Sequence, residues 1–137
     1  MDLATLFENI NWLSVIVASL AAFAIGSIWY SPVLFGKSWQ KEVGLSDEAI
    51  KSSNMVVIFG TAFILMFISA FILDMFIGPE ATAVIGLTAG LLVGVSWVAT
   101  ALGVTYLFAR KSFRLFLIDA GYFVVFFSVM GLILGSW

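Results

Sequence analysis

Four long stretches of this sequence contain no charged residue. They run from residue 9 to 36, from 52 to 73, from 81 to 109 and from 120 to 137. A helix that crosses a membrane needs about 20 mainly apolar residues, and each stretch comes close to or exceeds that length. The pattern therefore predicts four membrane-spanning helices, near residues 10–31, 55–77, 81–108 and 113–137.

The composition agrees with this class of protein. Of 137 residues, 63% are hydrophobic and 10% are charged, whereas a soluble domain is roughly 45–50% apolar and about 25% charged. A short soluble chain cannot bury so much apolar surface, because a small domain buries only about two-thirds of what its unfolded chain exposes. We therefore expect one all-α membrane domain over residues 1–137, in contact with the lipid bilayer. The acidic residues Asp2 and Glu8 precede the first stretch, which thus lacks the basic start of a signal peptide.

Several functional classes are disfavoured. The sequence has no Cys and no His, which removes disulfides, zinc sites of the Cys/His type and His acid–base catalysis. No nucleophile and base occur at a familiar spacing, so we predict no catalytic residue, no metal and no cofactor. The net charge of −2 argues against nucleic acid as a partner.

The connections between the spans differ in length. Residues 32–54 form the one sizeable loop, whereas Gly78-Pro79-Glu80 and residues 109–112 are tight turns. Proline ends one helix and suits the first turn of the next. Short connections make antiparallel neighbours, so we expect an antiparallel bundle of two hairpins.

The basic residues predict the orientation. All six lie in the first loop or around the third connection: Lys37, Lys41, Lys51, Arg110, Lys111 and Arg114. Lys and Arg stay on the cytoplasmic side of a membrane. We therefore expect a multi-pass membrane protein with both termini outside.

The end of the first span carries a distinctive block. Trp29 and Tyr30 come where that helix should reach the inner interface, a zone that Trp and Tyr favour. Pro32 disfavours helix at Ser31. The block is either a helix stop or a working site, and these residues alone leave both readings open.

The loop that follows mixes aromatic and basic residues. Residues 33–43 include Lys37 and have the composition of a short interfacial helix lying on anionic lipid. Ser46 precedes two acidic residues and can cap a further helix.

Small residues recur at four-residue spacing in the first and third spans and along one side of the fourth. The sets are Gly86, Gly90 and Gly94 in the third span, Ser14, Ala18, Ala22 and Gly26 in the first, and Gly121, Ser128, Gly131 and Gly135 in the fourth. Such spacing allows close helix packing; the other reading is a glycine-lined pore or groove. In the fourth span Asp119 and Tyr122 fall on the opposite side from these small residues. Both sides of that helix therefore need protein neighbours. Since a four-helix monomer can surround one helix only partly, we infer a homo-oligomer.

Asp119 lies about one and a half turns into the fourth span. An acid inside the membrane is a functional candidate by default. The alternative is a structural tether that accepts a hydrogen bond from Tyr122 or pairs with Arg110 or Arg114. Asp74, near the outer end of the second span, can reach water.

Two short segments echo each other. L-F-G-K-S-W at 34–39 is similar to L-F-A-R-K-S-F at 107–113, and each follows a Gly and a Tyr. The chain is either two duplicated hairpins in parallel orientation or two interfaces with the same composition.

Four motifs together resemble a known family. They are N-W-L at 11–13, G-S-I-W-Y-S-P-V-L-F-G-K-S-W at 26–39, L-I-D-A-G-Y at 117–122 and M-G-L-I-L-G-S-W at 130–137. They resemble the bacterial integral-membrane family catalogued as domain of unknown function 1761. The resemblance implies a small polytopic membrane protein without a known activity. It marks as motif positions Trp29, Tyr30, Ser31, Pro32, Lys37, Asp119, Gly121 and Tyr122.

Two functions follow from these features. The first is binding or passing a small solute or ion as an oligomer. A water-filled path lined by Asp119, Thr88, Ser96 or Thr100 would favour this function. The second is a non-transporting accessory or scaffold subunit, which a dry, fully packed bundle would favour. An enzyme is the least favoured class.

Overall fold

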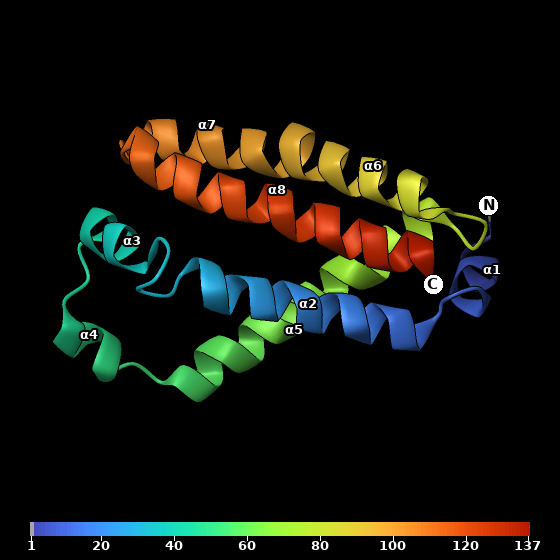
Figure 1. The fold of residues 1–137 in the computed structure, drawn as a ribbon, viewed down its shortest axis with the longest axis horizontal. Helices are drawn as coiled ribbons and strands as arrows, with labels where there is room; N and C mark the ends of the chain where they lie inside the picture. The colour runs from blue at the N-terminus through green and yellow to red at the C-terminus, as the bar shows by residue number, and fades with distance from the viewer. Residues whose placement is uncertain (1) are drawn as a thin grey trace.

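The computed structural model describes residues 2–137, which form helices joined by turns, with no strand among them (Figure 1). In chain order these are α1 (Leu3–Glu8), α2 (Trp12–Trp29), α3 (Gly36–Val43), α4 (Asp47–Lys51), α5 (Met55–Ile77), α6 (Ala83–Val93), the π-helical segment η1 (Gly94–Ala99), α7 (Thr100–Phe108) and α8 (Phe113–Ser136).

Four helices are long and apolar enough to cross a membrane. They are α2, α5, α8 and the continuous run Ala83–Phe108, which consists of α6, η1 and α7. The all-α class and the four predicted spans are confirmed, and the predicted limits lie within about two residues of the observed ones. Together these helices indicate a multi-pass membrane protein.

A polar side chain caps the start of each span. Asn11 accepts from the backbone N–H of Ser14 before α2, and Asn54 accepts from Val57 before α5. Thr82 and Ser112 do the same for α6 and α8. These caps satisfy backbone N–H groups that a helix leaves without partners, so the start of each span is fixed locally.

Helix α8 is the centre of the bundle. It packs most extensively against α6 and η1 on one side, and against α2 and α5 on the other. Figure 1 shows α8 between α6–α7 above and α2 below, with the two termini at one end of the molecule and α3 and α4 at the other. Of the four spans, α8 has the largest buried share.

The glycines of the third span bring α6 and α8 into close contact. A Cβ on Gly86 would meet the carbonyl of Gly131, and one on Gly90 would meet the carbonyl of Phe127. A Cβ on Gly94 would lie 2.9 Å from the Cα of Val124. Because each neighbour is backbone, only glycine fits these three positions, and the stripe serves helix packing within one chain.

The other face of α8 is also covered by the same chain. Tyr122, Phe126 and Met130 are buried in the core, where they pack with residues of α2 and α5. Both faces of α8 therefore have protein neighbours inside a single copy. The two-faced character of this helix is thus accounted for within one copy, and a homo-oligomer stays a prediction.

Helix α5 packs mainly against α2 and only lightly against α8. Its buried residues, Ala70 and Leu73, are both in its C-terminal half, near the end that holds the termini. Toward α4, α5 runs obliquely away from α8 (Figure 1). In its N-terminal half, Phe59 and Phe63 contact Phe23 of α2, and the side that faces α8 borders a cavity, as described below.

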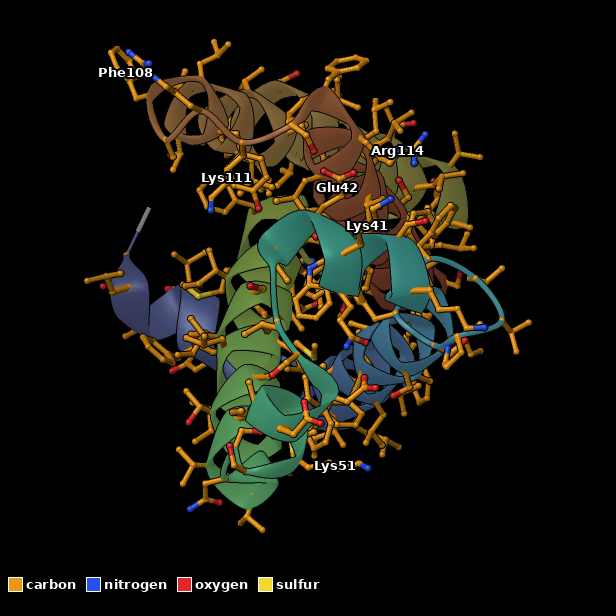
Figure 2. All side chains as sticks on the ribbon, turned by 90° about the vertical axis from the view of Figure 1, so that its left-hand side faces the viewer. Lys41, Glu42, Lys51, Phe108, Lys111 and Arg114 are labelled. Atoms are coloured by element: carbon orange, nitrogen blue, oxygen red, sulfur yellow. The ribbon has the colours of Figure 1, made fainter. Side chains whose placement is uncertain are left out.

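The loop after α2 folds over one end of the bundle. Helix α3 forms where the loop helix was expected and contacts α8, and the Ser112 hydroxyl donates to Glu42 at 2.6 Å. Ser46 caps α4, which ends before α5 begins at Met55. Figure 2 shows this end from outside, with Lys41, Lys51, Lys111 and Arg114 around α3 and α4. Contact of α3 with lipid stays a prediction.

Candidate functional site

Two tyrosines hold the Asp119 carboxylate. Asp119 is only 8% exposed. Its Oδ1 accepts from the Tyr30 hydroxyl at 2.7 Å, and its Oδ2 accepts from the Tyr106 hydroxyl at 2.5 Å. Tyr30 follows the last residue of α2, and Tyr106 belongs to α7. One carboxylate thus joins three spans of the bundle.

The partners that we predicted for Asp119 were wrong. Tyr122 donates its hydroxyl to the carbonyl oxygen of Ala22 at 3.0 Å. It turns toward α2 because Gly26 leaves room there: a Cβ on Gly26 would lie 2.8 Å from the Tyr122 oxygen. Arg110 and Arg114 are exposed, and both donors to Asp119 are neutral hydroxyls.

The residue before Tyr30 is tied to α8 in the same way. The indole N–H of Trp29 donates to the carbonyl oxygen of Ile118 at 2.9 Å. Its ring lies against Gly121, where an added Cβ would be 3.2 Å from the ring. Gly121 therefore makes room for Trp29 of α2, whereas Gly131 and Gly135 face α6. Grouping Gly121 with those glycines as one stripe was wrong.

The turn after α2 fixes where Tyr30 stands. The Ser31 hydroxyl donates to the carbonyl of Ile28 at 2.7 Å, and the N–H of Phe35 donates to the carbonyl of Trp29 at 3.0 Å. The N–H of Gly36 donates to the carbonyl of Ser31 at 2.9 Å. A Cβ on Gly36 would run into the carbonyl oxygen of Tyr30. Ser31 and Pro32 do end the helix, and the turn also positions the tyrosine that binds Asp119.

The π-helical segment explains why Tyr106 faces α8. Gly94 faces α8, and Tyr106 follows it in the same continuous span. In an uninterrupted α-helix, Tyr106 would point about 120° away from the Gly94 face. A π turn holds one more residue, which returns Tyr106 to within about 20° of that face. Helical periodicity alone therefore misses this residue.

The internal echo contained a signal for Tyr106. Tyr30 precedes Leu34-Phe35, and Tyr106 precedes Leu107-Phe108. The tyrosine that precedes each segment binds a different oxygen of the same carboxylate. A duplication of the two hairpins stays a prediction, but the tyrosines before the two echoing segments meet at Asp119.

A cavity of about 620 Å³ lies beside this carboxylate. Its walls come from α2, α3, α5, α7 and α8: Phe23, Gly26, Ser27, Tyr30, Trp39, Ile58, Phe59, Ala62, Met66, Tyr106, Asp119, Tyr122 and Phe123. Asp119 is the one carboxylate among these lining residues, and none of them is Lys or Arg. The α5 wall includes Ile58 and Phe59, each 49% exposed. The cavity thus combines a fixed anion with an aromatic and apolar lining.

Other candidates lie away from this cavity. Lys37 is exposed on α3, and Asp74 is half-buried toward the opposite end of α5. Thr88, Ser96 and Thr100 are exposed on the third span, and the Thr100 hydroxyl donates to the carbonyl of Ser96 at 2.6 Å. None of these three residues lines the cavity with Asp119.

A comparison with known protein families shows to which family the chain belongs. The family described as protein of unknown function (DUF1761) matches residues 13–135. The chain belongs to this family. The matched part of this DUF1761 chain includes Trp29 and Tyr30 as well as Ile118 and Asp119, so both sides of the contact fall inside it. No curated protein and no solved structure matches the chain.

Proposed function

We propose that this DUF1761 protein binds a small solute or ion in the cavity beside Asp119, and passes it across the membrane if the cavity opens to both sides. The observation that carries this proposal is the combination of about 620 Å³ of space with a carboxylate that two tyrosines hold in place. Ligand cavities typically measure about 300–1,000 Å³ and have apolar walls with a few placed polar groups.

Part of the proposal concerns membrane and assembly. All six Lys and Arg residues fall in the α2–α5 connection or around the 109–112 turn, which favours an orientation with both termini outside. A location in a bacterial inner membrane belongs to the same proposal. A homo-oligomer belongs to the same proposal. The half-exposed wall residues Ile58 and Phe59 support it, because a second copy lying there would close the cavity against lipid.

The second candidate is a non-transporting accessory or scaffold subunit. The observation that favours it is that both oxygens of Asp119 already accept hydrogen bonds within the chain. Asp119 then serves as a tether, and lipid tails fill the cavity. The two candidates differ in what occupies the space beside α5.

Accessibility to water separates these candidates. The sequence has no cysteine, so an introduced cysteine is the one thiol in the chain. Ala62 lines the cavity, and Ile64, on the same helix, is 60% exposed on the apolar surface. A charged, water-soluble methanethiosulfonate should label Ala62→Cys in membranes and leave Ile64→Cys unlabelled.

A different labelling pattern overturns the proposal. If only a membrane-permeant maleimide labels Ala62→Cys, the cavity holds lipid and the scaffold function is favoured. Labelling of Ala62→Cys by the charged reagent instead supports a water-filled binding site.

A further inference from the structure

The lining of the cavity selects for a class of ligand. This inference rests on the proposed function, since it asks what the cavity beside Asp119 would take. The wall contains Trp39 and six further aromatic residues: Phe23, Tyr30, Phe59, Tyr106, Tyr122 and Phe123. Aromatic faces carry partial negative charge and attract cations, most strongly where water is excluded. A carboxylate among such rings therefore favours positive charge.

The Asp119 carboxylate retains capacity for a further partner. An ionised carboxylate has about four acceptor sites, and the tyrosines Tyr30 and Tyr106 occupy one on each oxygen. Both donors are neutral, and no cationic side chain lines the cavity. A buried carboxylate is stabilised when it is paired with opposite charge.

We infer that the cavity binds a monovalent organic cation, a quaternary onium ion or amine with apolar substituents, whose charge lies against Asp119 and whose substituents lie against the aromatic wall. The T-shaped pair of Trp39 and Tyr30, with ring centroids 5.7 Å apart, places two of these rings at the α3 side of the site.

A bare metal ion fits this site poorly. Within residues 2–137, no three His, Cys, Asp or Glu side chains gather where they could hold a metal. Calcium takes six to eight oxygen ligands, and magnesium demands near-octahedral geometry. One carboxylate surrounded by rings and aliphatic side chains instead suits a large cation that sheds water easily.

The test uses two ions of the same shape and opposite charge, tetraphenylphosphonium and tetraphenylborate. Isothermal titration calorimetry is run on the full chain in a non-ionic detergent. Ala62→Phe fills the cavity from the α5 wall, and Ala24→Phe on the exposed face of α2 is its matched control. Since micelles take up both ions, binding counts only where Ala62→Phe removes it and Ala24→Phe does not.

We expect wild type to bind tetraphenylphosphonium at least about tenfold more tightly than tetraphenylborate, and Asp119→Asn to abolish that preference. Quenching of Trp39 fluorescence by a bound cation, absent in Trp39→Phe, places the ion in the cavity. If Asp119→Asn fails to fold, comparing wild type with Ala62→Phe still shows whether the cavity binds the cation more tightly than the anion.

The contrary results separate this inference from the proposed function. If both ions bind equally and Ala62→Phe removes both, the cavity binds solutes without regard to charge; the proposed function stands and the cation inference is overturned. If neither ion binds more tightly to wild type than to Ala62→Phe, the cation inference is again overturned. The cysteine labelling then decides independently whether a water-filled site exists.

Discussion

The Tyr30 hydroxyl lies 2.7 Å from Oδ1 of Asp119, a residue 89 positions further along the chain. The preceding pair, Trp29 and Ile118, has the same separation and is joined by an indole hydrogen bond. Two consecutive residues at the end of α2 thus bind two consecutive residues of α8. The motifs at residues 26–39 and 117–122 therefore meet in a single contact, and the cavity lies beside it.

Removing either tyrosine hydroxyl should destabilise the bundle. We expect Tyr30→Phe and Tyr106→Phe each to lower the free energy of unfolding by about 1.5–3 kcal/mol, the range for a hydrogen bond to a charged group. Unfolding in mixed micelles, followed by circular dichroism, measures this. Ser27→Ala is the matched control, because Ser27 lines the same cavity but bonds only the Phe23 carbonyl of its own helix. Two Phe variants as stable as the Ser27→Ala control would show that these bonds do not hold the bundle together.

The close contact of α6 with α8 predicts a strong effect at Gly90. We expect Gly90→Leu to cost a few kcal/mol or to block folding, because its side chain meets the backbone of Phe127 and Ser128. Gly60 of α5 is a matched control, since a Cβ there would meet no atom within 4 Å. Thermal melts and size-exclusion chromatography compare Gly90→Leu with Gly60→Leu. Equal stability of the two would contradict the packing described here.

The charge-free stretches predicted the four spans well, because burying charge in lipid is costly enough to override weaker local preferences. The spacing of Gly86, Gly90 and Gly94 likewise predicted a packing surface. It could not tell whether the partner belongs to the same chain, since small residues permit any close helix. The structure assigns that partner to α8.

Helical spacing could not identify the partners of Asp119, for two physical reasons. Tyr106 reaches α8 only because the π segment changes the register of the third span. Tyr122 lies one turn from Asp119, but the space at Gly26 draws it toward α2. In both cases helical spacing predicted one neighbour and tertiary packing selected another.

The distribution of basic residues predicts which end of the bundle faces the cytoplasm. In intact cells, single cysteines at positions 2 and 137 should react with an impermeant maleimide. A cysteine at position 40, in α3, should react only after the membrane is opened. The cysteine-free sequence makes each label unambiguous. Labelling of position 40 in intact cells would falsify the orientation, and labelling of half the molecules would indicate dual topology.

Asp119→Asn tests whether the carboxylate is a structural tether. Asparagine keeps the size of the side chain but replaces one acceptor oxygen with an amide that donates. One of the two tyrosines, Tyr30 or Tyr106, then faces the amide NH₂ group and has no acceptor. The other keeps an acceptor oxygen, but that oxygen no longer carries charge. If the tether is what Asp119 supplies, stability should fall by about 1–3 kcal/mol.

A binding role alone gives the opposite result for the same variant. A buried carboxylate that waits for a ligand is held at a desolvation cost, so its replacement by a neutral amide leaves stability unchanged or raises it. Melts of wild type and Asp119→Asn between pH 5 and 8 distinguish the two. We expect the variant to be the less stable protein at neutral pH and Tyr106→Phe to cost less in the Asp119→Asn background than in wild type, because the bond it removes is already weakened. A variant as stable as wild type, with Tyr106→Phe equally costly in both backgrounds, would assign Asp119 to ligand binding alone.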